Sequence, residues 1–286
     1  MDAHRAFYRM PLGYGPMPGP RQSAEGSPLA GWDQADVKTC TVVFRAPAKQ
    51  LADFLPHQCF LLDPLSSNPE GLATASISFT ELKNLPWLAG RGYNLCGLYI
   101  HDVVCRGAEE TVRGKYLSVL FENRADPIIS GREELGYAKV FASLDEEEGE
   151  SSVIVRMGWE GAIFGEMQLE SLEPASNSQE ESPTNPTGSN GILHYKYIPR
   201  TGSPGQADVE YPTYSPSPEK PVSVVQSIRV SPRANISFKA LGFSELPTLH
   251  HIAAKLASID IQDIVDARIT IAKGTTSLRE QRAIRM

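Results

Sequence analysis

The sequence predicts an α+β domain whose core is mainly a curved antiparallel sheet or β-barrel, with a few flanking helices. Apolar and polar residues alternate over four early segments, 39–44, 73–79, 116–121 and 153–159. Such alternation is typical of strands that bury one face. Hydrophobic residues make up 41% of the 286 residues and charged residues 21%, so the chain is able to bury a substantial core.

The chain divides into an arm, a folded domain and a tail. Residues 1–36 are rich in proline and glycine and predict an extended N-terminal arm, whose aromatic side chains can pack on the body or on another subunit. Residues 37–274 are expected to form the folded domain. Within it, Ser, Asn, Pro and Glu replace apolar residues over 173–191, which predicts a flexible surface insertion. Residues 275–286 form a charged C-terminal tail that is expected to fray.

Strand signals resume after the insertion, and short strands are predicted over 192–199, 207–211 and 222–230. A helical pattern follows over 246–256, where Pro247 suits the first turn. A last strand is predicted over 259–271. His250 and His251 are adjacent in the predicted helix and point about 100° apart, so they are not expected to form a metal-binding pair.

Composition argues against several classes of function. A formal net charge of -7 argues against nonspecific binding to nucleic acid, which depends on basic patches. No segment approaches the roughly 18 apolar residues needed to span a membrane, so no membrane association is expected. The four cysteines form no Cys-x-x-Cys pair and have no closely spaced histidines, so no metal is expected. The N-terminus lacks the apolar run of a signal peptide, which predicts a cytoplasmic protein with reduced thiols.

One lysine, Lys139, lies in an apolar run directly after a charged turn that contains glycine. The segment 131–140 reads Gly-Arg-Glu-Glu-Leu-Gly-Tyr-Ala-Lys-Val, and the lysine is expected at the edge of a buried sheet. A solvated lysine has a pKa of about 10.4, and burial lowers this pKa and favours the neutral amine that attacks a carbonyl. The alternative from spacing alone is a lysine that lays its stem on apolar neighbours and keeps its ammonium in water.

This segment resembles the active-site segment of the acetoacetate decarboxylase family, whose lysine forms a Schiff base with a keto acid and is a known example of an activated amine. The lysine position falls on Lys139. The resemblance extends over about 41–273: residues 42–45 and 51–56 resemble the opening strand, short helix and proline turn, and 93–100 resemble the strand with the catalytic glutamate. It implies one acetoacetate decarboxylase-like domain, no cofactor and a homo-oligomer.

Three family positions are occupied by other residue types here. The glutamate falls on Leu95, the second lysine on Val140, and the carboxylate-binding arginine on Val37, unless a one-residue shift brings Lys38 or Asp36 there. The resemblance therefore implies an apolar pocket lined by Val37, Leu95, Val140 and Tyr137. Without the second lysine beside it, the pKa of Lys139 would fall by desolvation alone, and the acid that replaces the family glutamate is not assigned by the resemblance. Without the arginine, a small keto acid loses a charge-assisted hydrogen bond worth about 1.5–3 kcal/mol, so acetoacetate is not the expected substrate.

The candidate catalytic residues are Lys139, Glu133 and His101. Histidine suits proton transfer at neutral pH, and Asp102 and Tyr137 are further candidates. Taken alone, His101 is more readily interpreted as a histidine at a strand end whose ring hydrogen-bonds to the backbone. Arg132 and Glu133 are equally consistent with a structural ion pair that fixes the turn. The candidate substrate-binding residues are Tyr137, Arg132, Leu95, Val140, Val37 and Tyr93.

The expected function is that of a cofactor-independent lyase of the acetoacetate decarboxylase type. Its substrate is expected to be a bulky apolar carbonyl compound or β-keto acid, such as a polyketide-like or terpenoid-like intermediate of secondary metabolism, bound as a Schiff base to Lys139. Aldol, dehydration or cyclisation chemistry on the same scaffold is the alternative enzyme class. A third alternative is a pocket that binds an apolar ligand without covalent catalysis, in which Lys139 is not a nucleophile.

Overall fold

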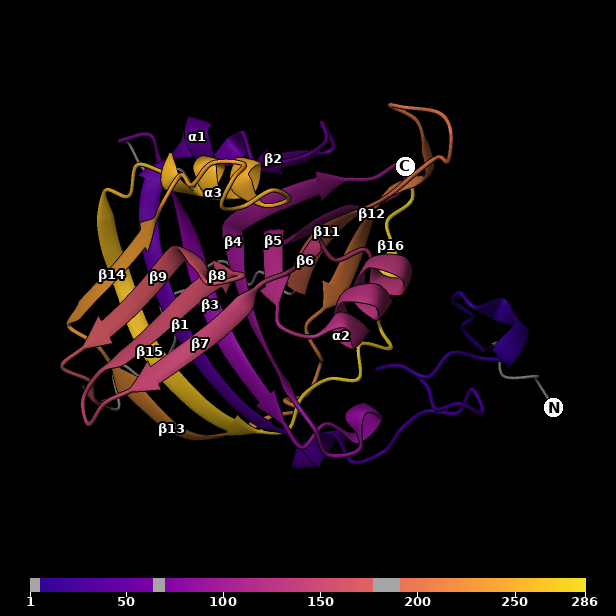
Figure 1. Cartoon of the computed structure of the whole chain (residues 1–286), viewed down its shortest axis with the longest axis horizontal. Coiled ribbons are helices and arrows are strands. Elements are labelled where there is room, and N and C mark those ends of the chain that lie inside the picture. The colour runs from indigo at the N-terminus through magenta and orange to yellow at the C-terminus, as the bar shows by residue number, and fades with distance from the viewer. Residues whose placement is uncertain (1–5, 64–69, 177–190) are drawn as a thin grey trace.

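The computed structural model describes residues 6–63, 70–176 and 191–286 of the chain. In this part of the chain, a large curved sheet packs against a smaller sheet, and short helices flank the strands (Figure 1). The predicted architecture, a mainly antiparallel sheet with few helices, is confirmed. Among the described residues, no helix is long and apolar enough to cross a membrane.

The large sheet has twelve strands within the described residues, in the order β10-β13-β15-β1-β3-β4-β5-β11-β12-β16, with β2 paired to β4 and β6 paired to β5. Its strands are β1 (Asp36–Pro47), β2 (Phe60–Leu62), β3 (Leu72–Lys83), β4 (Tyr93–Arg106), β5 (Thr111–Glu122), β6 (Lys139–Phe141), β10 (Glu173–Pro174), β11 (Gly191–Pro199), β12 (Ala207–Pro216), β13 (Val224–Val230), β15 (Asp263–Lys273) and β16 (Arg282–Ala283). Only the pairings of β5 with β11 and with β6 are parallel. Because the order runs from β10 to β16 without closing in the described part, the sheet is open rather than a barrel.

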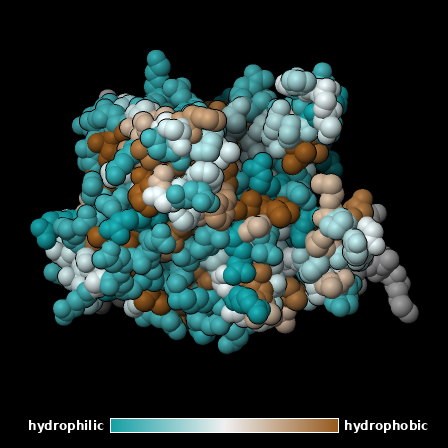
Figure 2. Space-filling model, in the orientation of Figure 1, coloured by the Kyte–Doolittle hydropathy of each residue, from teal (hydrophilic) through white to brown (hydrophobic). Residues whose placement is uncertain are grey.

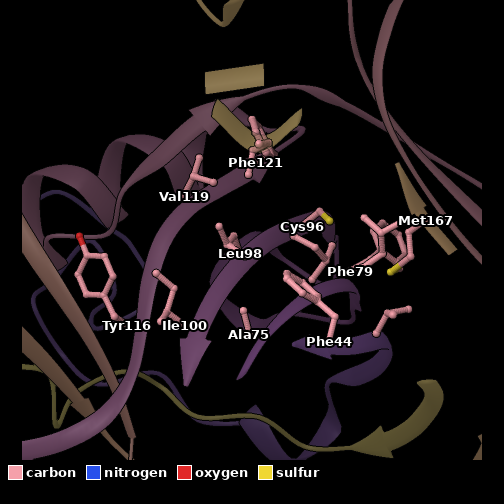
Figure 3. Close-up of a cluster of buried hydrophobic side chains, with 14 of the residues drawn as sticks. Phe44, Ala75, Phe79, Cys96, Leu98, Ile100, Tyr116, Val119, Phe121 and Met167 are labelled. Atoms are coloured by element: carbon pink, nitrogen blue, oxygen red, sulfur yellow. The ribbon is translucent and has the colours of Figure 1, made fainter. Parts of the chain in front are cut away.

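The smaller sheet has the order β14-β9-β8-β7 and covers one face of the large sheet (Figure 1). Its strands are β7 (Ser143–Glu148), β8 (Val153–Trp159), β9 (Ala162–Glu170) and β14 (Arg233–Phe238). The main core lies between the sheets, where Phe44, Phe79 and Leu98 from the large sheet are buried with Met167 of β9 (Figure 3). Fully burying one such side chain contributes about 1.5–3 kcal/mol, and this packing fixes which face of each large-sheet strand points away from the core.

Short helices connect the strands. The α-helices are α1 (Ala48–Ala52), α2 (Ala125–Ser130) and α3 (His250–Ala257), and the remaining turns are η1 (Leu12–Tyr14), η2 (Trp32–Gln34), η3 (Pro86–Leu88) and η4 (Gly131–Leu135). The first three of these turns are 3₁₀-helical, whereas η4 is a π-helical turn that continues directly from α2. Single π-helical turns are frequent at functional sites.

Three predicted elements differ from the structure near the C-terminus. The predicted helix begins at His250, so Pro247 precedes it, because the residues before it form consecutive turns rather than a regular helix. The last long strand begins at Asp263 rather than at residue 259. The tail does not simply fray, since Arg282–Ala283 forms β16 and pairs with β12.

The predicted insertion and the predicted N-terminal arm compare differently with the structure. The predicted insertion begins with β10, which pairs with β13, and its residues 177–190 lie outside the described residues. In the arm, Arg9 and Arg21 both form ion pairs with Glu134 of the body. The face of the molecule in Figure 2 is largely hydrophilic, with scattered hydrophobic patches.

Candidate active site

Lys139 lies on the face of the large sheet that points away from the core. The parallel pairing of β6 with β5 sets Lys139 beside Leu120. From there a row of paired residues crosses β4, β3 and β1 through Gly97, Ser78 and Thr41. Directly paired residues point to the same face of a sheet. One continuous face therefore joins the lysine to the middle of β1 and β3.

The ammonium of Lys139 is in contact with a buried carboxylate. Nζ lies 2.9 Å from Oε1 of Glu122, and the two side chains are 6% and 0% exposed. Nζ also donates a 3.0 Å hydrogen bond to the carbonyl oxygen of Pro127 in α2. Apart from the contact with Nζ, the carboxylate oxygens of Glu122 have no hydrogen-bond partner among the described residues. The two groups therefore form a dehydrated pair with few other partners.

Burial shifts both groups toward their neutral forms. It lowers the pKa of Lys139, and the charge of Glu122 and its hydrogen bond with Lys139 oppose that shift. Burial also raises the pKa of Glu122, against the charge and hydrogen bond of Lys139. Desolvation is the largest cause in each case, and transfer of one proton from Nζ to the carboxylate removes two buried charges at once. The pair can therefore supply a neutral amine without a base from solvent.

The turn before the lysine provides space for its side chain. A Cβ at Gly131 would lie 2.5 Å from Cδ and Cε and 2.7 Å from Nζ of Lys139, so the lysine lies directly over this glycine. Arg132 donates a 2.8 Å hydrogen bond from Nη1 to the Lys139 carbonyl. At Gly136, φ is +82° and a Cβ would meet Lys196 and Thr213 at under 3.0 Å, so the end of the turn also requires glycine. The glycines and arginine of the motif thus set the position of Lys139.

The N-terminal arm is attached to the same turn. Arg9 forms an ion pair with Glu134 of η4, and the side chains are 7% and 6% exposed. Arg21 lies 3.4 Å from the other carboxylate oxygen of Glu134. Removing one partner of a buried ion pair is strongly destabilising. The arm therefore helps to hold the turn that carries Gly131.

Tyr137 is held by a buried hydrogen-bond network. Its hydroxyl lies 2.9 Å from Ser215 Oγ, which also contacts His194 Nε2 at 3.0 Å and donates to Gln281 Oε1. Because Gln281 Oε1 can only accept, Ser215 uses its one proton there and accepts hydrogen bonds from Tyr137 and His194. Burial raises the pKa of Tyr137 to about 12, and burial with the charge of Lys139 lowers the pKa of His194 to about 3. The network is therefore neutral, and the Tyr137 ring, 5.1 Å from Lys139 Nζ, faces the amine.

Two adjoining cavities lie along this face of the sheet. The larger has a volume of about 560 Å³ and is lined by residues of β1, β3, β4, β5, β11, β13 and β15. The smaller, of about 180 Å³, is lined by Tyr137 and Ser215, and both cavities share Gly191, Ile192 and Ser217. Tyr137 therefore connects the cavities to the amine. In the described residues, no group of three or more His, Cys, Asp or Glu side chains gathers in a way that could hold a metal.

A family model for acetoacetate decarboxylase matches residues 14–276. The chain belongs to the acetoacetate decarboxylase family. The fold is similar to an acetoacetate decarboxylase structure with a TM-score of 0.62 at 13% identity, covering 92% of this chain and 94% of that one. It is also similar to acetoacetate decarboxylase from Legionella pneumophila, with a TM-score of 0.60 at 14% identity and 86% of each chain covered. No curated protein matches the sequence.

A third similar structure is the enduracididine biosynthesis enzyme MppR, in complex with the condensation product of pyruvate and imidazole 4-carboxaldehyde. Its TM-score is 0.57 at 10% identity, and 88% of each chain is covered. An acetoacetate decarboxylase-like enzyme from Sphingomonas wittichii also has a TM-score of 0.57, at 14% identity over 91% of this chain and 95% of that one. The acetoacetate decarboxylase scaffold therefore extends over nearly the whole chain.

Several predicted site residues of this acetoacetate decarboxylase family member do gather near the lysine. Tyr137 faces the amine, and Leu95 pairs directly with Glu122 across β4 and β5. Tyr93 lies two residues from Leu95 on the same face, and burial together with the charge of Glu122 raises its pKa. These side chains form an apolar and aromatic surround for the pair of Lys139 and Glu122.

Other predicted residues lie elsewhere. His101 Nε2 is 2.9 Å from Ser76 Oγ and borders the larger cavity, and burial lowers its pKa to about 3. Val140 packs against the core, since it follows Lys139 in the strand and points to the other face. Val37 pairs with Leu82 and Ala272 near the far end of β1.

The two charged residues of the motif have structural contacts. Glu133 accepts a 2.6 Å hydrogen bond from Lys196 Nζ through its backbone carbonyl. The alternative of an ion pair between Arg132 and Glu133 is not found in the described residues, since Arg132 bonds the Lys139 carbonyl and Glu134 holds the arm.

The sequence analysis missed Glu122. It left open which acid replaces the family glutamate, with Glu133 and Asp102 among the candidates, whereas the carboxylate in contact with Lys139 is that of Glu122, opposite Leu95 on the neighbouring strand. The available signal was an acidic residue at the end of an apolar run, 17 positions before Lys139 in the printed sequence. Without the register of β4, β5 and β6, that signal does not distinguish a buried acid from an exposed strand end.

Proposed function

We propose that the protein is a cofactor-independent lyase that binds a bulky carbonyl substrate as an imine on Lys139 and uses Glu122 for proton transfer. The observation that carries this proposal is the 2.9 Å contact between two almost fully buried, oppositely charged groups, next to Tyr137, which lines a cavity. Strongly perturbed groups of this kind cluster at functional sites. Family membership adds the expectation of carbonyl chemistry at this lysine.

The first half of the proposed reaction forms the imine. Glu122 takes a proton from the Lys139 ammonium, and the neutral amine adds to the substrate carbonyl to give a carbinolamine. The amine nitrogen transfers one proton to the newly formed alkoxide, which gives the carbinolamine hydroxyl. Glu122 then returns its proton to the carbinolamine hydroxyl, which leaves as water and yields a protonated imine. The proton that Glu122 takes from Lys139 is thus the one that it later gives to the leaving hydroxyl, within a buried site.

The second half releases carbon dioxide. In a β-keto acid, the bond between the α carbon and the carboxylate breaks, and its electron pair moves through the carbon framework to the iminium nitrogen to form an enamine. The α carbon takes a proton in place of the lost carbon dioxide, which regenerates the iminium. Water then adds to this iminium, and the ketone product leaves as the lysine amine is restored.

An aldol-type condensation is the second candidate reaction. The similar structure of MppR holds a condensation product of pyruvate and an aldehyde, which supports carbon–carbon bond formation on this scaffold. The same enamine would then attack an aldehyde carbon instead of taking a proton. The proposed substrate is a biosynthetic intermediate larger than acetoacetate, and the proposed assembly is a homo-oligomer.

Intact-mass detection of a borohydride-reduced adduct tests the proposal. Wild-type protein, Lys139→Ala, Lys139→Arg and the surface control Lys239→Ala are incubated with hydrophobic β-diketones and β-keto acids and then reduced. We expect an adduct with wild type and Lys239→Ala but with neither Lys139 variant, because arginine keeps the charge and does not form the imine. An equal adduct yield in Lys139→Ala, or no adduct from any compound with wild type, would overturn imine chemistry at this site.

A further inference from the structure

The larger cavity is lined mainly by polar side chains rather than by the apolar residues that the sequence suggested. Many lining residues carry hydroxyl groups, and charged groups lie on two of its strands. The hydroxyl-bearing residues include Thr39, Thr41, Ser76, Ser78, Tyr99 and Thr270, and the charged residues are Lys115, Asp266 and Arg268. A volume of about 560 Å³ is in the range of sites that hold small organic ligands.

The hydroxyls form an ordered stripe across β1 and β3. Thr39 Oγ1 lies 3.1 Å from Thr80 Oγ1, and Thr41 Oγ1 lies 2.9 Å from Ser78 Oγ. A hydroxyl has one donor and two acceptor positions, so each pair keeps hydrogen-bonding capacity for a third group. A ligand with oxygen atoms along its chain can use that capacity.

Part of the polar wall is buried, which distinguishes it from an ordinary solvated sheet face. Ser76 is 2% exposed and His101 is 5% exposed, and they hydrogen-bond to each other at 2.9 Å. Buried polar groups are costly unless they have partners. The buried Ser76 and His101 therefore make this part of the wall suited to a ligand with polar atoms.

The charged groups of the cavity leave a net positive charge. Arg268 Nε lies 2.6 Å from Asp266, so this cation has an acidic partner. Lys115 forms no ion pair with any described residue, and Asp102 is the acid whose charge acts on it. The lining therefore carries two cations, Lys115 and Arg268, against the single anion Asp266, in a chain whose net charge is -7.

Lys115 and the reactive lysine lie on the same sheet face at a distance that one substrate can span. Lys139 pairs with Leu120, and Lys115 is five residues earlier on β5, which corresponds to roughly 15 Å along a strand. An extra residue between Leu117 and Val119 shifts the alternation of β5, so Lys115 and Leu120 point to the same face. The larger cavity adjoins the smaller one at Gly191 and Ile192. Tyr137 lines that smaller cavity and faces the amine of Lys139.

We propose that the larger cavity binds the distal end of the carbonyl substrate, and that this end is a carboxylate on an oxygen-bearing chain. Lys115 binds the carboxylate, the hydroxyl stripe bonds oxygen atoms of the chain, and the carbonyl end reaches Lys139. This inference rests on the proposed imine chemistry and names its substrate class. The substrate is thus a long oxygenated keto acid whose middle part crosses the sheet face beside Tyr99 and Gly97 of β4, which pair with Leu117 and Leu120 of β5.

The test compares two probes that differ only at the distal end: a β-diketone whose chain ends in a carboxylate, and its methyl ester, each in several chain lengths. Dissociation constants are measured by calorimetry, and trapping rates by borohydride reduction. Wild-type protein is compared with Lys115→Met, Lys115→Arg and the surface control Lys220→Met. At the best chain length, we expect wild type to bind the carboxylate about 10- to 100-fold more tightly than the ester, the range of a charge-assisted hydrogen bond.

In Lys115→Met the preference should disappear while the affinity for the ester stays unchanged, which also shows that the variant is folded. Lys115→Arg and Lys220→Met should keep the preference. Equal affinity of wild type for both probes at every chain length, or an undiminished preference in Lys115→Met, would overturn the inference. A preference that depends on Lys115 without any reduced adduct would instead retain this binding site and refute the imine on Lys139.

Discussion

Adding one methyl group at Gly131 tests the geometry of the site most directly. In Gly131→Ala, the new Cβ would meet Cδ, Cε and Nζ of Lys139 at 2.5–2.7 Å, well inside van der Waals contact. The backbone of Gly131 is helical, with φ -66° and ψ -42°, so alanine is accommodated without strain. The atoms that must move belong to the flexible end of Lys139, and the amine is displaced from Glu122.

The displacement should reduce reactivity much more than stability. A misplacement of about 1 Å can lower a rate by about 100-fold, which corresponds to about 2.7 kcal/mol in the activation free energy. We therefore expect the rate of borohydride-trapped adduct formation in Gly131→Ala to fall by about 100-fold. Thermal stability should fall only slightly, because overpacking against Lys139 costs about 1–3 kcal/mol and alanine offsets about 1 kcal/mol of this by favouring a helix over glycine.

A second glycine provides the matched control. Gly13 lies in η1 of the arm, and a Cβ there would meet no atom within 4 Å. Gly13→Ala should therefore trap the probe at the wild-type rate. The same rate in Gly131→Ala would mean that Lys139 does not react from its position over Gly131, and the argument from its contact with Glu122 would fail.

Two further variants test the electrostatics. In Glu122→Gln, the pH at which the trapping rate begins to rise should be lower, because the carboxylate charge raises the pKa of Lys139. The maximal trapping rate should fall by about 100- to 10,000-fold, because the variant lacks the proton acceptor. A rise that begins at higher pH than in wild type would contradict this reasoning. Arg9→Ala should lower the free energy of unfolding by about 3 kcal/mol, because it removes a partner of buried Glu134, whereas Arg200→Ala breaks an exposed pair and should lower it by less than about 1 kcal/mol. Equal losses for the two arginine variants in denaturant titrations would refute the role of the arm.

Strand periodicity predicted much of the large sheet because its strands have one apolar face. Residues 39–44 alternate as expected for β1, whose core-facing residues are buried while Thr39 and Thr41 border the cavity. The same pattern does not reveal that a strand face forms a polar cavity, since a hydroxyl stripe in sequence looks like a solvated face. The helix start at His250 was missed because Pro247 suits both a first helical turn and the turn that precedes a helix.

The missing acid shows a limit of aligning residue types position by position. On β4, Leu95 occupies the position that the resemblance assigns to a glutamate, and its direct partner on β5 is Glu122. Paired side chains on neighbouring strands have Cβ atoms only about 4.5–5.5 Å apart, so a carboxylate on either strand can reach the same lysine. If the site needs a buried proton acceptor beside Nζ, the carboxylate must lie at that place, but either strand can carry it. In this chain the loss of an acid on one strand therefore does not exclude the proposed chemistry, and we expect Glu122→Gln, rather than a substitution at Leu95, to remove it.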